Sequence, residues 1–159
     1  MNLVMVDAGG SNLGSVRYAL QRLGVEARLS ADPAVIRAAD RVLLPGVGAA
    51  GPGMARLREL GLVEVMRSLT QPVLGICLGM QLLFEASEEG GTDCLGLLPG
   101  TVRRMAPAPG LRVPHMGWNR LEPRRPSPLL DGIAPGDWAY FVHGYAAPVT
   151  DDCVAASTH

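Results

Sequence analysis

The first 90 residues alternate apolar segments with segments whose apolar residues recur at helical spacing. The apolar segments predict buried strands over residues 3–7, 25–30, 42–44 and 72–77. Helical spacing predicts helices over residues 13–23, 33–39, 53–68 and 78–86. Asn12 is a candidate cap for the first helix, Gly24 its stop, and Gly61 a break in the third. Such alternation is typical of a mostly parallel sheet with helices on both faces.

The pattern changes after residue 90, where prolines and glycines become frequent. Three further short strands are predicted over residues 101–105, 118–121 and 138–143. We expect them to add mixed or antiparallel strands to the α/β fold. The proline-rich stretches 106–114 and 123–128 are interpreted as ordered loops. The sequence predicts a single domain over residues 1–159.

Length and charge limit the classes of function. A chain of 159 residues suits one domain. Its 14 basic and 15 acidic residues give a formal net charge of −1 without a long run of either sign, so we expect no nucleic acid or membrane partner. No apolar stretch approaches the ~20 residues that a membrane span requires. We therefore expect a soluble, cytoplasmic protein.

The chain has three cysteines, Cys77, Cys94 and Cys153, and no Cys-x-x-Cys pair. An odd number without such a pair argues against a disulfide framework and against a zinc site. We expect no metal and no other cofactor. Cys94 and Cys153 have no distinctive setting, so we interpret them as structural or incidental.

Cys77 lies in Gly75-Ile76-Cys77-Leu78-Gly79, where a predicted strand turns directly into a predicted helix. Glycines on both sides of a central nucleophile are the signature of a nucleophile elbow, a tight turn that exposes the side chain at the sheet edge. The alternative is a small buried apolar residue, the usual role of an intracellular cysteine. The paired glycines favour the nucleophile. The N–H of Leu78 would then point to where an oxyanion forms.

Residues 72–84, Pro-Val-Leu-Gly-Ile-Cys-Leu-Gly-Met-Gln-Leu-Leu-Phe, with Ser-Glu-Glu at 87–89, resemble the nucleophile region of triad-type class I glutamine amidotransferases. Met80-Gln81 narrows the resemblance to the HisH family, the glutaminase subunits of imidazole glycerol phosphate synthase, since related enzymes more often carry His-Gln there. Three further segments agree with that family: 44–48, 114–119 and 140–145. The resemblance implies a flavodoxin-like amidotransferase fold.

The resemblance also implies a covalent mechanism. Cys77 would attack the side-chain amide of glutamine, ammonia would leave, and water would hydrolyse the glutamyl thioester. The oxyanion donors implied are the backbone N–H groups of Val47 and Leu78.

Four residues match the family's substrate-binding positions: Gly46, Gly48, Gln81 and Glu89. Gln81 and Glu89 would hold the amino-acid end of glutamine, where a carboxylate can accept hydrogen bonds from the substrate ammonium. On sequence alone both could be ordinary helix-surface residues. The segment 45–48 could likewise be a turn that merely ends a strand.

The family works as a heterodimer with a cyclase subunit in histidine biosynthesis, and the resemblance implies that partner here. The positions that match the boundary with the cyclase are Asn12, Pro114, His115, Met116 and Trp118. The stretch 115–119 could equally be core, since tryptophan is usually buried whatever the function. Asn12 follows a turn in which Ser11 stands where the family has glycine.

A catalytic cysteine needs a base, commonly a histidine oriented by a carboxylate. The family carries this pair in a Phe-His-Pro-Glu segment, and no His-Pro-Glu occurs here. The three histidines, His115, His143 and His159, match other positions of the family pattern. We therefore expect the sequence to stop before the C-terminal strands and helix that complete the triad. Residues 1–159 alone would then show little or no glutaminase activity.

Two alternatives remain open on sequence alone. One is the glutaminase of another amidotransferase, which Met80-Gln81 and residues 115–119 disfavour. The other is a non-catalytic interaction homologue that has kept the fold and lost the base, supported only by the absence of His-Pro-Glu.

Overall fold

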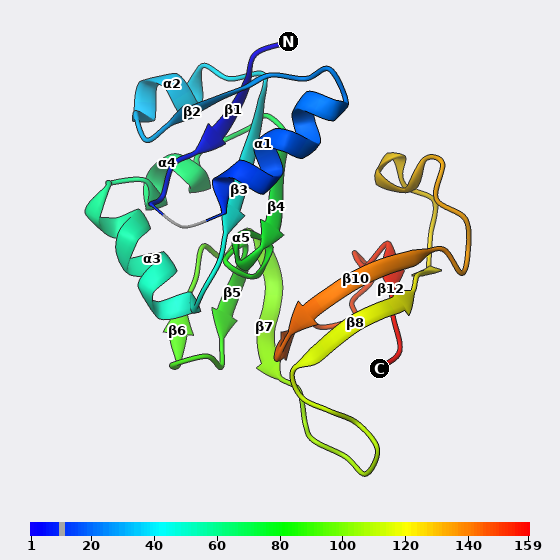
Figure 1. The fold of residues 1–159 in the computed structure, drawn as a ribbon. Coiled ribbons are helices and arrows are strands. Elements are labelled where there is room, and N and C mark those ends of the chain that lie inside the picture. The colour runs from blue at the N-terminus through cyan, green and yellow to red at the C-terminus, as the bar shows by residue number, and fades with distance from the viewer. Residues whose placement is uncertain (10–11) are drawn as a thin grey trace. The chain divides into compact units, whose positions relative to one another are not determined.

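The structure, a computed structural model, describes residues 1–9 and 12–159, so the predicted departure from the family turn at Ser11 lies outside the described residues. The chain forms two compact units, Met1–Val102 and Arg103–His159 (Figure 1). The expectation that residues 1–159 form a single domain stays a prediction.

The first unit is built on a parallel four-stranded sheet in the order β2-β1-β3-β4. Its strands are β1 (Leu3–Val6), β2 (Ala27–Ser30), β3 (Arg41–Gly46) and β4 (Val73–Cys77). The four predicted strands and the parallel sheet are confirmed. β3 runs further than predicted, through Pro45 and Gly46, because these two residues pair in register with Ile76 and Cys77 of β4.

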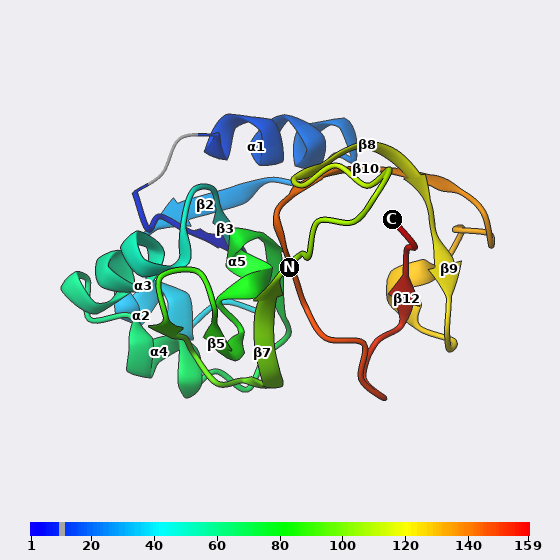
Figure 2. The same cartoon turned by 90° about the horizontal axis from the view of Figure 1, so that it is seen from below.

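Helices cover both faces of this sheet (Figure 2). They are α1 (Leu13–Arg22), α2 (Pro33–Arg37), α3 (Ala50–Glu59), α4 (Val63–Arg67) and α5 (Leu78–Gln81). On one face, α1 packs on Leu3, Met5 and Leu43. On the other, the remaining helices enclose the larger core around Val4 and Leu44. None of the described helices is both long and apolar enough to cross a membrane.

The ends of α1 follow the prediction only in part. Gly24, with φ 69°, ends the helix in a Schellman motif, in which its N–H donates to Gln21 O and that of Val25 to Leu20 O, both at 2.9 Å. Asn12 takes the N-cap position, but its side chain accepts from the Ser15 hydroxyl and caps no backbone N–H. Leu23, predicted on the apolar stripe, is exposed.

The prediction of a helix over residues 78–86 is wrong beyond Gln81. Residues Phe84–Ser87 form strand β5, which pairs in parallel with β7 (Leu98–Arg104) and antiparallel with β6 (Thr92–Asp93). Phe84 and Ser87 are buried in this second sheet. Pairing with distant strands therefore overrides the helical spacing of the apolar residues.

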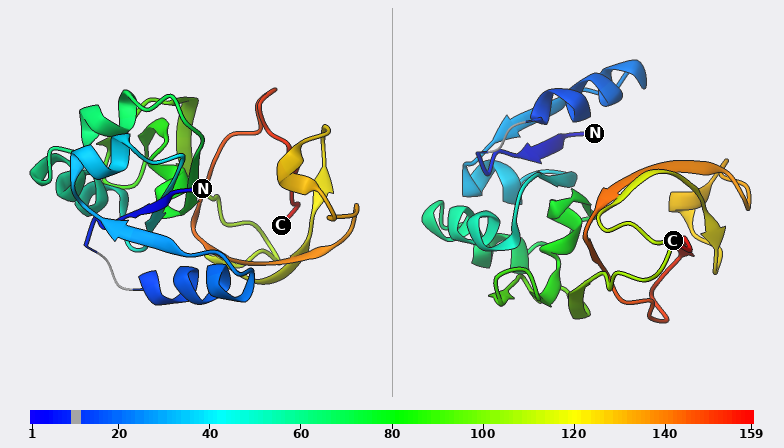
Figure 3. Two further views of the ribbon diagram at one scale, coloured as in Figure 1. Left: turned by 90° about the horizontal axis from the view of Figure 1, so that it is seen from above. Right: turned by 60° about the horizontal axis from the view of Figure 1, so that its bottom comes forward.

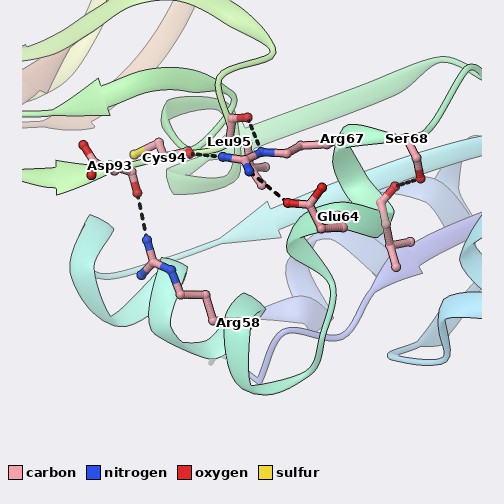
Figure 4. A network of polar contacts seen from close by, with 8 residues as sticks. Arg58, Glu64, Arg67, Ser68, Asp93, Cys94 and Leu95 are labelled. Atoms are coloured by element: carbon pink, nitrogen blue, oxygen red, sulfur yellow. Dashed lines mark hydrogen bonds and ion pairs between the residues drawn. The ribbon is translucent and has the colours of Figure 1, made fainter.

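Two arginines tie the segment after β6 to the helices (Figure 4). Arg67 of α4 donates through Nε to Leu95 O at 3.0 Å and through Nη2 to Cys94 O at 3.3 Å. Arg58 of α3 donates to Asp93 O at 3.2 Å. Cys94 is buried, and burial raises the pKa of its thiol. Its position is that of a structural residue, as predicted.

The connection from β4 to α5 is so tight that glycine is required at two positions. A Cβ on Gly79 would lie 1.8 Å from the carbonyl oxygen of Leu44 in β3. A Cβ on Gly75 would lie 2.5 Å from Cα of Met80. Neither glycine has a positive φ, so lack of space, and not backbone conformation, excludes a side chain.

The second unit contains antiparallel pairs. β8 (His115–Arg120) pairs with β10 (Trp138–His143) along its whole length (Figure 3). The shorter elements are β9 (Glu122–Pro123), η1 (Pro128–Leu130), β11 (Tyr145–Ala146) and β12 (Ala155–Ala156). β12 pairs with β9, and β11 with the end of β7. The strands predicted over 101–105, 118–121 and 138–143 are confirmed.

All three histidines of the chain meet in the second unit. His115 is 5% exposed, and its ring stacks on those of His159 and Phe141, with centroids 3.9 and 5.0 Å away. Its Nδ1 lies 3.2 Å from Nε2 of His143, whose own Nδ1 lies 2.8 Å from Tyr145 O. Because a carbonyl only accepts, His143 carries its proton on Nδ1 and His115 donates to its Nε2. Burial, then His159 and His143, lower the pKa of His115.

The lowered pKa of His115 predicts that acid destabilises the fold. Below about pH 6.5 the unfolded chain takes up a proton at this position that the folded chain resists, so the free energy of unfolding falls with pH. Urea denaturation at about pH 7.5 and about pH 5.5 measures the loss. His115→Phe keeps a stacking ring but cannot titrate, and should lose less stability between the two conditions. An equal loss in both proteins would refute the assignment.

The close approach at Gly79 predicts a large cost for a single methyl group. Gly79→Ala should lower the free energy of unfolding by about 2–3 kcal/mol or more, because β3 must shift to admit the Cβ. Gly14→Ala in α1 is the control: its Cβ meets nothing nearer than 3.7 Å, so it should be neutral or stabilising by up to about 1 kcal/mol. Chemical denaturation compares the two. Similar effects for both variants would show that the contact is relieved cheaply.

Candidate active site

Cys77 stands at the junction of β4 and α5 with its thiol exposed. Its backbone has φ 56° and ψ −118°, a sparsely populated conformation for a residue with a side chain, which costs about 1–3 kcal/mol. The register of β4 with β3 and the contacts at Gly75 and Gly79 hold it there. Cys77 therefore does not occupy the buried apolar position that was the alternative on sequence.

The loop after β3 lies against this turn. Gly46 pairs in register with Cys77, and a Cβ on Gly46 would lie 3.0 Å from the backbone N of Gly79. Gly48 has φ 95° and nothing within 4 Å of its Cβ position, so backbone conformation requires glycine there. Val47, between them, is exposed. The fold thus brings the loop with Val47 next to the turn with Leu78, the two predicted oxyanion donors.

Leu78 fixes the turn from below. Its side chain is buried and lies under Gly46 and Gly53, whose Cβ positions are 3.2 Å from Leu78 Cβ and Cδ2 respectively. The exposed Cys77 and the buried Leu78 are neighbours in sequence. The thiol is therefore presented to solvent while the next residue anchors the backbone in the core.

The two predicted side-chain ligands of glutamine have different settings. Gln81 is the last residue of α5 and is half-buried. Glu89 lies in the turn between β5 and β6, so the alternative of an ordinary helix-surface residue is wrong for it. Its Oε2 accepts from the N–H of Ala50, the first residue of α3, at 2.9 Å. Glu89 therefore contacts the segment that follows the Gly46–Gly48 loop.

No base is assigned among the histidines. All three lie in the second unit, and each has a ring nitrogen within hydrogen-bonding distance of another group of that unit. The sequence contains no His-Pro-Glu. The expectation that residues 1–159 alone hydrolyse glutamine poorly stays a prediction.

An apolar face is exposed on the second unit, along β8 and β10. We name it the β8–β10 face; its apolar residues are Met116, Trp118, Trp138, Tyr140 and Val142. They lie side by side because Trp118 pairs with Tyr140 and Met116 with Val142 in the ladder. The Trp118 and Tyr140 rings meet edge to face at 5.5 Å, and the Arg120 guanidinium lies 5.1 Å from the Trp138 ring.

Sequence reasoning named two of these five residues. Met116 and Trp118 were predicted at the partner boundary, whereas Trp138, Tyr140 and Val142 were missed. Their signal was the period-2 pattern of β10, which alternates them with Ala139, Phe141 and His143. Of the other predicted boundary residues, Asn12 and Pro114 are exposed and His115 is buried. The partner role of these three stays a prediction.

The sequence is closely similar to bacterial proteins of one name. The imidazole glycerol phosphate synthase subunit HisH of Xanthomonas campestris pv. campestris (strain 8004) is 65% identical over 158 residues, which cover 99% of this chain and 79% of that protein. The subunit HisH of Xylella fastidiosa (strain Temecula1) is 62% identical over 157 residues, covering 99% of this chain and 78% of that protein.

Solved structures show the same fold at lower identity. A crystal structure of a glutamine amidotransferase superposes with a TM-score of 0.73 at 21% identity, over 96% of this chain and 78% of that one. A GMP synthase protein from Thermoplasma acidophilum gives a TM-score of 0.66 at 18% identity, over 99% and 73%. The family model "Glutamine amidotransferase class-I" matches residues 4–158. The chain belongs to the class I glutamine amidotransferases and, within them, to the HisH family of imidazole glycerol phosphate synthase subunits.

Proposed function

We propose that Cys77 is the nucleophile with which this glutaminase releases ammonia from glutamine, and that the ammonia passes to a cyclase subunit. The observation that carries the proposal is an exposed thiol on a strained turn, pressed against a glycine loop that can supply an oxyanion donor. Family membership supports the reaction, because relatives at 65% identity carry the name of the synthase subunit.

The reaction divides into two acyl transfers. The Cys77 thiolate attacks the side-chain carboxamide carbon of glutamine, the C–N bond breaks, and the nitrogen leaves as ammonia after taking up a proton. Water then attacks the thioester, the C–S bond breaks, and glutamate is released with the thiol restored. Glutamine and water are consumed, and glutamate and ammonia are formed.

Negative charge develops on the carboxamide oxygen in both steps. The proposed donors are the N–H groups of Val47 and Leu78, on the two segments that the pairing of Gly46 with Cys77 holds together. Removing one such donor typically costs about 2.7–4 kcal/mol in the barrier. The close packing at Gly46 and Gly79 supports this role, because donors must be positioned before the charge forms.

Recognition of the substrate's amino-acid end is assigned to Gln81 and Glu89. Glu89 keeps a carboxylate at the start of α3, near the proposed oxyanion loop, and a carboxylate suits an ammonium group. Gly46 and Gly48 let the substrate approach the loop backbone, since neither carries a side chain. The base and its carboxylate are not assigned within residues 1–159.

The two compact units are proposed to belong to one amidotransferase domain, since the family match at residues 4–158 runs across the boundary between Val102 and Arg103. The β8–β10 face is proposed as the part that docks on the cyclase. Exposed tryptophan, tyrosine and methionine side chains are the types enriched at interface centres, and Met116 and Trp118 match the family's boundary positions. A biosynthetic heterodimer of this kind is proposed to work in the cytoplasm.

Replacing the nucleophile tests the mechanism. In the full-length protein with its cyclase subunit, Cys77→Ala should lower glutamate release by at least about a thousandfold, since no other thiol lies on the turn. Cys153→Ala is the matched control and should keep wild-type turnover. Binding of the cyclase should survive in both variants. Turnover by Cys77→Ala within about tenfold of wild type would remove Cys77 from the mechanism.

Truncating the β8–β10 face tests the docking surface. Trp118→Ala should raise the Kd for the cyclase by about 30-fold, the effect of losing one aromatic interface anchor. Met116→Ala should weaken binding less, and Leu129→Ala not at all, although Met116 and Leu129 are 64% and 67% exposed. Sedimentation or calorimetry gives the constants. Unchanged binding by Trp118→Ala, or equal losses for Met116→Ala and Leu129→Ala, would place the interface elsewhere.

A further inference from the structure

We infer that Glu89 is a positioning residue: by capping α3 its carboxylate holds the segment that carries Val47. The inference rests on the proposed oxyanion role of Val47. It assigns Glu89 a second task beside recognition of the substrate ammonium. Four steps lead to it, from the needs of α3 to the geometry of the loop.

Helix α3 has no cap of its own. Its N-cap residue is Ala49, whose side chain cannot accept a hydrogen bond, and its first turn has no acidic residue. Pro52 at the third position has no N–H to satisfy. Ala50, however, is fully buried (0% exposed), so its N–H cannot turn to water and needs an acceptor inside the protein.

Glu89 is that acceptor, although it is 39 residues away in sequence. Its Oε2 lies 2.9 Å from the N of Ala50. A carboxylate at a helix N-terminus also interacts favourably with the helix dipole. The bond therefore supplies from another part of the fold what a serine or aspartate at position 49 would supply locally.

The backbone of Glu89 is itself fixed by two buried hydroxyl side chains. Its N–H donates to Ser87 Oγ at 3.1 Å, and its carbonyl oxygen accepts from Thr92 Oγ1 at 2.8 Å. Ser87 and Thr92 are 2% and 8% exposed. Because both peptide groups of Glu89 are bonded, its side chain starts from a defined position and can act as a strut.

The strut acts on the loop because the loop is short. Val47, Gly48 and Ala49 connect Gly46, paired with Cys77, to Ala50, bonded to Glu89. Gly48 has no neighbour within 4 Å of its Cβ position, so lateral packing does not hold that residue in place. The direction of the Val47 N–H therefore depends on the two ends of the loop, and Glu89 fixes one of them.

Two substitutions separate the tasks of Glu89. Glu89→Gln keeps an oxygen for the Ala50 N–H but loses the charge for the substrate ammonium, so KM should rise while kcat stays within about threefold of wild type. Glu89→Ala loses both, so kcat should fall a further tenfold or so, as an oxyanion donor loses its alignment. The assay uses the full-length protein with its cyclase subunit. Equal kcat values for the two variants would overturn the positioning role.

A second measurement does not depend on activity. Amide hydrogen exchange of Ala50 should be about tenfold faster in Glu89→Ala and near wild type in Glu89→Gln, in line with the loss of a helix cap. Glu85→Ala is the matched control, because its carboxylate also accepts from a distant backbone N–H, that of Gly100 at 2.8 Å, and it should leave Ala50 unchanged. Unaltered exchange in Glu89→Ala would overturn the cap. If the wild-type enzyme released no ammonia, the proposed function would fail while this result still stood.

Discussion

The proposed site depends on the direct backbone contact between α5 and the sheet. The Cβ that Gly79 lacks would fall 1.8 Å from Leu44 O, so α5 sits closer to β3 than any side chain would allow. This closeness turns the chain so sharply at Cys77 that the residue takes a positive φ and leaves its thiol exposed. Without that contact, neither the turn nor its distance from the Gly46 loop would be defined.

The support around the turn extends outward in steps. Leu78 and Leu82 fill the space that glycine at position 53 leaves beside α3. α3 in turn receives the Glu89 carboxylate at its first residue, and Arg58 and Arg67 hold the segment after β6 from α3 and α4. Buried apolar packing places these elements, and a few long-range polar bonds set their ends. Rigid surroundings of this kind are what preorganised oxyanion donors require.

Much of this could be predicted from the sequence, because local patterns carried it. The strands before Pro45 and at Cys77, the break at Gly61 and the glycine-flanked turn all follow from residue types within a few positions. Strand β5 could not be predicted, since the apolar residues after Gln81 continue a helical spacing and only pairing with β7 makes them a strand. The Glu89–Ala50 bond was equally hidden, because it joins residues 39 apart. The missed half of the β8–β10 face was readable as alternation in β10.

The central claim is that the exposed sulfur of Cys77 attacks the carboxamide of glutamine. Its most direct test is mass spectrometry of the full-length protein, in complex with its cyclase partner, after treatment with an electrophilic glutamine analogue. The account predicts one covalent adduct, on Cys77, whose formation glutamine slows in competition. An adduct on Cys153, or labelling of Cys77 that glutamine leaves unchanged, would contradict it.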